Sequence, residues 1–252
     1  MNKIISFFKK LNKKQKRLCI IGASALAFVL VVFLVLYNNG YSGLHTSARY
    51  HDGQIKVACV GDSTTYGHGI SGWAKNNYPA KLQSILGESY HVQNFGKSGS
   101  TASDDGDQPY TKSAEYKNSI EYDADILVIM LGTNDSKEEN WTGAIDFTNR
   151  MDALIESYKK DNSDLRVIIC TPTCSFYPAG QNSGKTNFDV RPAIVSEIKN
   201  HLRTYALSHG YELVDVYDLT QYHHEWFDDN VHPSADGANA IAEVIAKKIK
   251  SK

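Results

Sequence analysis

The stretch 125-DILVIMLGTND-135 decides the fold class of this chain. Residues 126–131 are all apolar, which is typical of a strand that is covered on both faces. Similar runs are 55-IKVACVG-61, 90-YHVQNF-95, 166-RVIICTP-172 and 211-YELVDVY-217. Segments with helical patterning lie near 76–87, 112–121, 142–161, 188–209 and 234–250. Because strands and helices alternate, the sequence predicts a parallel sheet in a three-layer α/β domain.

Polar, glycine-containing clusters follow most of these predicted strands. Gly61-Asp62-Ser63 follows the first strand, 94-NFGKSGST-101 the second and 131-LGTND-135 the third. The cluster 228-DDNVHPSADG-237 comes after the last strand, across a short connection. Sites in such sheets collect beyond the carboxyl ends of the strands. We therefore expect the four clusters to converge on one site.

The residue types in these clusters suit acyl transfer. A serine hydroxyl is a good nucleophile only when a base takes its proton and a third group orients that base. Asp229 and His232 are three positions apart, so the carboxylate can hold Nδ1 and leave Nε2 to face Ser63. The backbone N–H groups of Ser63 and Gly99 and the side-chain amide of Asn134 are candidate oxyanion-hole donors. This chemistry requires no metal or organic cofactor, and no cysteine or histidine spacing resembles a zinc site.

Several neighbouring residues leave alternatives open. Ser63 could be an ordinary helix cap, and Asp228 competes with Asp229 as the orienting carboxylate. His68 either lines the site or is exposed. The residues expected to be structural or solvated are Asp62, Asp135, Gly96, His223 and His224.

The four blocks, taken together and in order, resemble those of the SGNH (GDSL-type) hydrolases. They are Gly-Asp-Ser, Asn-x-Gly-x-Ser-Gly, Gly-x-Asn-Asp and Asp-x-x-His, and the resemblance spans residues 57–245. It implies a nucleophilic Ser63, a triad completed by Asp229 and His232, and an oxyanion hole that includes Gly99 and Asn134. It also implies a flavodoxin-like sheet of order 2-1-3-4-5 with Ser63 at the switch point. Thr64 stands where the family commonly has Leu or Ile.

The N-terminal part of the chain differs from the rest in charge and hydropathy. Residues 1–17 carry seven of the 27 basic residues and no acidic one, which leaves 20 basic against 28 acidic residues in the remainder. That balance argues against nucleic acid as a partner of the main domain. Residues 18–37, LCIIGASALAFVLVVFLVLY, carry no charge and predict a transmembrane signal anchor. The positive-inside rule then keeps the basic tail in the cytoplasm. Residues 38–53 are expected to form a stalk, and 54–252 an extracytoplasmic hydrolase domain at the cell membrane.

The expected function is that of a membrane-anchored serine esterase that removes acetyl groups from carbohydrates. The segments 131-LGTNDSKEENW-141 and 106-GDQPYTKSAEY-116 are similar to the carbohydrate O-acetylesterase branch of the family. Alternatives are a lysophospholipase or thioesterase, an O-acetyltransferase acting on cell-surface polysaccharide, and an inactive glycan-binding module. The expected partners are an acetylated sugar or glycan and the membrane, with the oligomeric state open.

Two residue sets remain ambiguous. Aromatic residues near the clusters suit either sugar stacking or core packing; they are Tyr66, Trp73, Tyr110, Trp141 and Trp226. The four cysteines do not form a disulfide framework, so free thiols are expected, although a Cys170–Cys174 bridge is possible.

Overall fold

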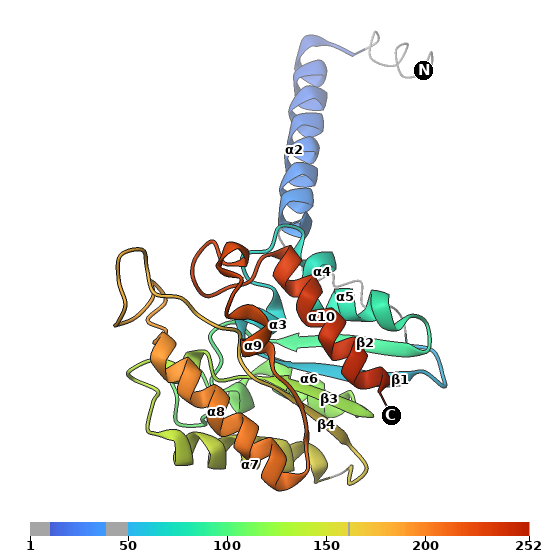
Figure 1. The fold of residues 1–252 in the computed structure, drawn as a ribbon. Helices are drawn as coiled ribbons and strands as arrows, with labels where there is room; N and C mark the ends of the chain where they lie inside the picture. The colour runs from blue at the N-terminus through green and yellow to red at the C-terminus, as the bar shows by residue number, and fades with distance from the viewer. Residues whose placement is uncertain (1–10, 39–49, 161, 252) are drawn as a thin grey trace. The chain divides into compact units, whose positions relative to one another are not determined.

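The computed structural model describes residues 11–38, 50–160 and 162–251. The chain divides into two compact units, residues 1–45 and 46–252. Helix α2 (Lys13–Asn38) belongs to the first unit (Figure 1). The strands and the other helices in the described part of the chain belong to the second unit, which carries all four sequence clusters.

The transmembrane prediction for residues 18–37 is wrong. A spanning helix needs about 20 consecutive, predominantly apolar residues. Among the helices in the described part of the chain, none is long and apolar enough to cross a membrane. The prediction of a single-pass membrane location, with a cytoplasmic N-terminus and an extracytoplasmic domain, is wrong with it. Most of the predicted basic tail and stalk, residues 1–10 and 39–49, lies outside the described residues.

The second unit is built on a five-stranded sheet of order β2-β1-β3-β4-β5. Every neighbouring pair of strands is parallel. The strands are β1 (Ile55–Gly61), β2 (Tyr90–Gly96), β3 (Ile126–Met130), β4 (Arg166–Cys170) and β5 (Glu212–Val214). The predicted α/β class and the strand order 2-1-3-4-5 are confirmed. Because β1 lies between β2 and β3, the switch point of the sheet is at the carboxyl end of β1.

Along the chain, helices follow the strands much as the sequence predicts. The five longer helices of the second unit are α5 (Tyr78–Leu86), α6 (Ala114–Glu121), α7 (Ala144–Lys159), α8 (Pro192–His209) and α10 (Ala235–Lys250). Shorter helices are α3 (Ser63–Tyr66), α4 (Trp73–Asn76) and α9 (Val216–Thr220). Single 3₁₀ turns are η1 (Tyr110–Lys112), η2 (Asn134–Ser136) and η3 (His224–Trp226).

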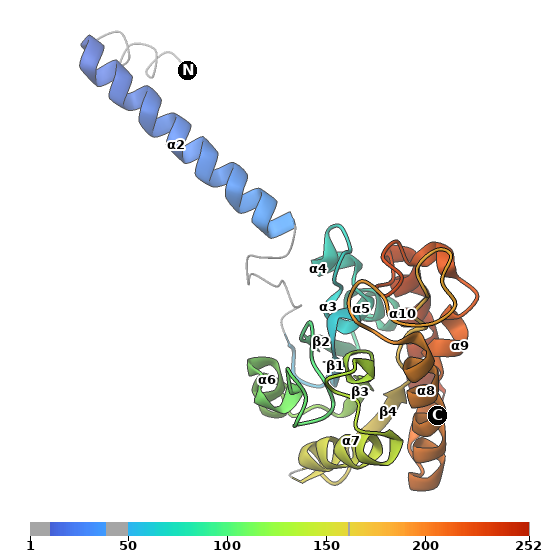
Figure 2. The same cartoon turned by 90° about the vertical axis from the view of Figure 1, so that its left-hand side faces the viewer.

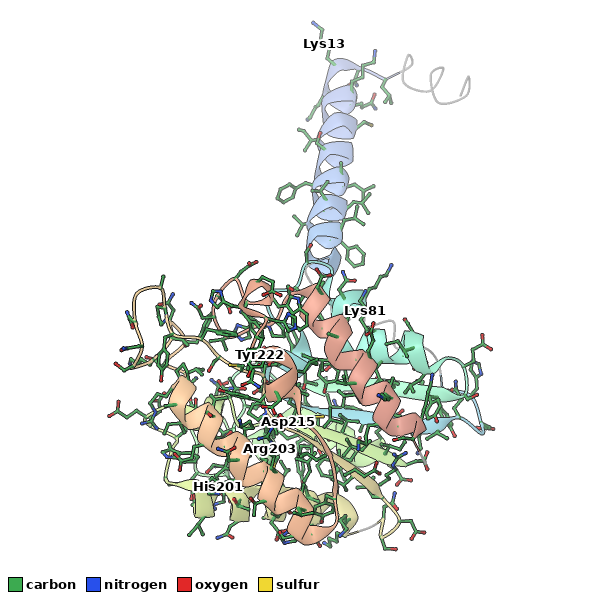
Figure 3. The ribbon with its side chains drawn as sticks, in the orientation of Figure 1. Lys13, Lys81, His201, Arg203, Asp215 and Tyr222 are labelled. Carbon is green, nitrogen blue, oxygen red and sulfur yellow. The ribbon has the colours of Figure 1, made fainter. Side chains whose placement is uncertain are left out.

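The last predicted strand, residues 211–217, is shorter in the structure. Strand β5 stops at Val214 because the next residue, Asp215, begins a helix. The Asp215 side chain caps α9 by accepting a hydrogen bond from the backbone N–H of Asp218 at 3.0 Å. Arg203 of α8 also donates to the Asp215 carboxylate (Figure 3).

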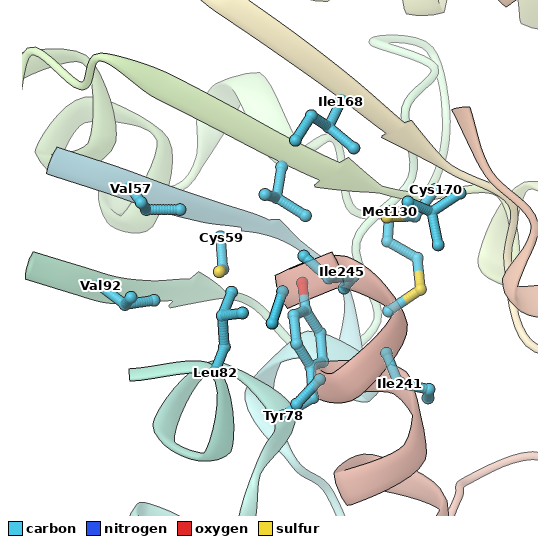
Figure 4. Packing of buried hydrophobic residues seen from close by; sticks show 14 of the residues in the cluster. Val57, Cys59, Tyr78, Leu82, Val92, Met130, Ile168, Cys170, Ile241 and Ile245 are labelled. Atoms are coloured by element: carbon cyan, nitrogen blue, oxygen red, sulfur yellow. The ribbon is translucent and has the colours of Figure 1, made fainter. Parts of the chain in front are cut away.

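Both faces of the sheet are covered, which explains the unbroken apolar runs. Val57 and Cys59 of β1 point to one face, where they pack with the buried residues of α5 and α10 (Figure 4). Ala58 and Val60 point to the opposite face, which α7 and α8 cover (Figure 2). Each fully buried Leu or Ile in these layers stabilises the fold by roughly 1.5–3 kcal/mol. The apolar face predicted for α10 is buried as expected; its members are Ala238, Ile241, Ala242, Ile245 and Ile249.

The structure answers two questions that the sequence left open, one about the cysteines and one about the aromatic residues. All four cysteines are free, so the Cys170–Cys174 bridge is not formed. Burial raises the pKa of the Cys59 and Cys170 thiols. Trp73 and Tyr110 are buried, which favours core packing for these two rings.

Candidate active site

Ser63 stands at the first position of α3, two residues after the end of β1. The preceding residue caps this helix: Asp62 Oδ1 accepts a hydrogen bond from the Thr64 backbone N–H at 2.9 Å. Burial raises the pKa of Asp62, partly opposed by this hydrogen bond. The Ser63 hydroxyl therefore does not serve as the cap and is available for another partner.

That partner is His232, which lies 169 positions further along the chain. The distance between His232 Nε2 and Ser63 Oγ is 2.9 Å. On the other side of the ring, His232 Nδ1 lies 2.7 Å from Asp229 Oδ2. Both His232 and Ser63 are buried. The structure thus joins hydroxyl, imidazole and carboxylate in one line of hydrogen bonds.

The segment 229–232 forms a tight local turn around the Asp229 carboxylate. Asp229 Oδ1 accepts hydrogen bonds from the backbone N–H groups of Val231 at 2.9 Å and His232 at 2.7 Å. Asn230 adopts the left-handed conformation with φ 68°, which an asparagine tolerates better than most residues. The local turn therefore helps to hold the carboxylate against the imidazole.

The electrostatics of the turn fix the proton on the imidazole. Burial works to raise the pKa of Asp229, but the hydrogen bonds from the His232 side chain and backbone outweigh it and lower the pKa to about 2. An ionised carboxylate only accepts hydrogen bonds, so Nδ1 of His232 carries a proton. Nε2 of the neutral ring is then an acceptor for the Ser63 hydroxyl.

The candidate oxyanion donors lie on three loops at the same edge of the sheet. Ser63 opens a helix, where backbone N–H groups have no intrahelical acceptor. Gly99 follows β2 with φ +84°, and a Cβ there would lie 2.8 Å from the Gln108 side chain. Asn134 follows β3, and its Nδ2 donates to the Ser100 carbonyl oxygen at 3.1 Å. Asn134 thus ties its own loop to the loop that carries Gly99.

Asp135 reinforces the same connection as a structural carboxylate. Its two oxygens accept hydrogen bonds from the backbone N–H groups of Ala102 at 3.1 Å and Ser103 at 3.0 Å. The side chain is buried, and this burial raises its pKa to about 6 despite those bonds. The structural role predicted for Asp135 agrees with these contacts.

The other histidines named from the sequence have different partners. His223 pairs with Glu225 at 2.7 Å and stacks on Trp226. His224 Nε2 lies 3.0 Å from Asn230 Oδ1. Within the described residues, no cluster of three His, Cys, Asp or Glu side chains could hold a metal ion.

Gly96 is required for a close approach of two backbones. A Cβ at Gly96 would lie 2.2 Å from the Tyr66 backbone nitrogen, so only glycine lets the end of β2 approach α3. The sequence predicted a tight turn at Gly96, whereas in the structure this glycine allows a close contact between β2 and α3.

Two rings adjoin His232, and the sequence indicated only one of them. The His68 ring centroid lies 4.5 Å from that of His232. Phe188 lies 4.9 Å away at an interplanar angle of 88°, although residues 188–209 are patterned like a helix. The helix α8 begins at Pro192, because a residue before proline avoids the helical conformation. The proline was the available signal that Phe188 belongs to a loop.

The sequence pattern of the GDSL-like lipase/acylhydrolase family matches residues 59–240. The chain belongs to this family. The match begins at Cys59 in β1, ends at Ala240 in α10 and includes every residue of the candidate site.

A curated protein of similar sequence is an acetylxylan esterase from Xylanibacter ruminicola. It is 34% identical over 214 residues, which are 78% of this chain and 43% of the esterase. The chain therefore spans less than half the length of that relative.

Solved structures of similar fold include two carbohydrate esterases. A carbohydrate acetylesterase from Sinorhizobium meliloti has a TM-score of 0.60 at 18% identity, covering 78% of this chain and 98% of its own. A mutant acetyl-xylooligosaccharide esterase from Geobacillus Stearmophilus has a TM-score of 0.58 at 20% identity, covering 80% of this chain and 98% of its own. At these identities the likeness supports the fold.

Proposed function

We propose that the domain formed by residues 54–252 is a serine esterase that removes acetyl groups from carbohydrate esters. The observation that carries the proposal is the hydrogen-bonded line from Ser63 Oγ through His232 to Asp229. Family membership supports ester hydrolysis, since the family is one of lipases and acylhydrolases. The similarity to an acetylxylan esterase supports an acetylated sugar as substrate.

The first half of the proposed reaction forms an acyl-enzyme. His232 Nε2 takes the hydroxyl proton while Ser63 Oγ attacks the ester carbonyl carbon, and Asp229 stabilises the imidazolium that results. The negative charge on the former carbonyl oxygen is held by the N–H groups of Ser63 and Gly99 and by the Asn134 amide. The imidazolium then gives its proton to the alcohol oxygen, the C–O bond breaks and the alcohol leaves.

The second half releases the acid and restores the site. His232 removes a proton from a water molecule, which attacks the acyl carbon of the Ser63 ester. The tetrahedral intermediate collapses, the proton returns to Ser63 Oγ and acetate leaves. Every proton in both halves passes through Nε2, which the geometry places 2.9 Å from the serine oxygen.

Acetate release from a panel of acetylated glycans tests the proposal. The wild-type chain and Ser84→Ala, an exposed serine on α5, are expected to release acetate at equal rates. Ser63→Ala is expected to fall to the background rate. A wild-type rate equal to that of Ser63→Ala on every ester would contradict the proposal.

The same assay separates the acyl and acceptor alternatives. Faster cleavage of long-chain than of acetyl 4-nitrophenyl esters would move the assignment to a lysophospholipase or thioesterase. Faster acetyl transfer to an added glycan than to water would move it to an acetyltransferase.

A further inference from the structure

The rings of His68 and Phe188 both lie beside the ring of His232. The centroids of His68 and Phe188 lie 4.5 Å and 4.9 Å from that of His232, and 6.3 Å from each other. Phe188 retains 38% of its surface exposed, and His68 is also exposed. Both rings therefore contact the buried imidazole while leaving part of their surface open to a ligand.

The position of Phe188 is held by its own loop. Its backbone N–H donates to Thr186 Oγ1 at 3.2 Å, and the Thr186 N–H donates to the Val190 carbonyl oxygen at 2.8 Å. Val190 is buried in a small apolar cluster with Val231, the residue before His232. The loop that presents Phe188 is thus packed onto the turn that presents the imidazole.

The chemistry of the proposed reaction identifies which part of a substrate lies beside these rings. In acylation the proton on His232 Nε2 goes to the oxygen of the departing alcohol, so that oxygen must lie within about 3 Å of Nε2. The acyl group stays on Ser63 Oγ. Side chains in contact with the imidazole are therefore placed to touch the alcohol.

The two rings offer different contacts. Phe188 presents an apolar aromatic surface of the kind that packs against the C–H face of a sugar ring. In the described part of the chain, neither ring nitrogen of His68 has a hydrogen-bond partner, so both are available to hydroxyl groups. Burial and the neighbouring His232 lower the pKa of His68, which favours the neutral ring that can donate and accept.

We propose that Phe188 and His68 form the subsite for the sugar ring that carries the departing alcohol oxygen. The inference rests on the proposed esterase function and adds the determinant of its alcohol specificity. An aromatic surface beside a hydrogen-bonding imidazole fits a polyhydroxylated ring better than an alkyl chain, because an alkyl chain has no group that can form a hydrogen bond with the imidazole.

Two acetyl esters with different alcohols provide the test. Vinyl acetate and an acetylated xylo-oligosaccharide form the same acetyl-enzyme, so a change in the ratio of their kcat/KM values reports contacts with the alcohol alone. Phe188→Ala is expected to lower this ratio, sugar ester over vinyl ester, roughly tenfold. Phe188→Tyr retains the ring and is expected to keep the wild-type ratio.

His68 and a distant surface residue complete the set of variants. His68→Ala is expected to lower the ratio about fivefold, and His68→Gln, which retains hydrogen-bonding groups, to restore part of it. Leu207→Ala, at an exposed position near the end of α8, serves as the control that leaves both rates unchanged.

The outcomes separate the subsite from the esterase function. If Phe188→Ala lowers kcat/KM for both esters by the same factor, the ring only positions His232 and the subsite proposal is overturned. If the wild-type chain hydrolyses neither ester faster than Ser63→Ala, the esterase function itself is overturned.

Discussion

Two histidine–carboxylate pairs lie within ten residues of each other, and only one of them reaches a serine. His223 and Glu225 approach to 2.7 Å, and His232 and Asp229 approach to the same 2.7 Å. The side chains of the first pair are 41% and 65% exposed, whereas those of the second pair are 7% and 34% exposed. The buried pair also has a third member, Ser63 Oγ, on the far side of its imidazole.

The difference shows that a close histidine–carboxylate contact is not in itself a catalytic arrangement. The exposed pair lies in water, where solvent and salt screen the interaction between its two side chains. In the buried pair the same contact fixes a tautomer, because Asp229 is held by two backbone N–H groups as well as by the ring. Burial, together with the third partner, distinguishes the two.

Replacing each imidazole gives the largest expected contrast. His232→Ala removes the base and is expected to lower kcat for acetate release by about 10⁵-fold or more, by analogy with other serine hydrolases. His223→Ala is expected to leave kcat within about twofold, since its ring touches Glu225 and Trp226. Steady-state acetate release, with circular dichroism to confirm folding, measures both. Similar losses in the two variants would mean that the buried pair has no special role.

Replacing each carboxylate tests the orienting role. Asp229→Asn is expected to lower kcat about 10⁴-fold, because an amide nitrogen favours the tautomer with the proton on Nε2. Glu225→Gln is expected to leave the rate unchanged. A near-normal rate for Asp229→Asn would make another group, such as the neighbouring Asp228, the orienting carboxylate.

The contrast between buried and exposed partners extends to amide side chains. Asn134→Ala is expected to lower kcat about 10²- to 10³-fold through the loss of one oxyanion donor. Asn239→Ala removes a half-buried amide of α10 that donates an exposed hydrogen bond to Glu243 at 2.7 Å, and it is expected to have no effect. A rise in KM with kcat unchanged would mean that Asn134 binds the ground state and the transition state equally, which contradicts a role as an oxyanion donor.

The smallest effect concerns a third carboxylate, Asp135, whose neighbours are backbone N–H groups. Burial raises its pKa from 3.8 to about 6, so between these values the folded chain binds a proton that the unfolded chain does not. The stabilisation from this group is therefore present below pH 3.8 and is lost as pH rises through about 6.

Asp135→Asn is expected to remove this dependence. The free energy of unfolding of the variant should change less between pH 4 and 6 than that of the wild type, by about 2 kcal/mol. Urea unfolding at pH 4, 5, 6 and 7 measures the difference. Parallel curves for the two proteins would show that Asp135 titrates in the same range when folded and unfolded.

Much of the domain could be predicted because local patterns control it. The apolar runs indicated five strands, since a strand covered on both faces has no polar side. The motif blocks indicated which strand ends carry the site, since parallel strands share a carboxyl edge. The Asp229–His232 contact followed from a spacing of three residues, which a single turn closes.

Other features depended on competing local signals. The run at 211–217 predicts one strand, but the side chain of Asp215 begins a helix in its middle. The helical pattern at 188–209 included Phe188, although Pro192 starts the helix four residues later. The segment 18–37 predicted a transmembrane anchor, and no described helix meets the requirement for one.

The sequence by itself determined the α/β class, the strand runs and the identity of the residues with reactive groups, because periodicity and residue type are properties of short segments. The motif blocks named His232 as the expected partner of Ser63, but only the tertiary structure decided the distance between them, because the two residues are 169 positions apart and no local pattern encodes it. It also decided that Phe188 lies against His232. Packing of the loops at the carboxyl edge of the sheet sets these contacts, and packing depends on the whole fold.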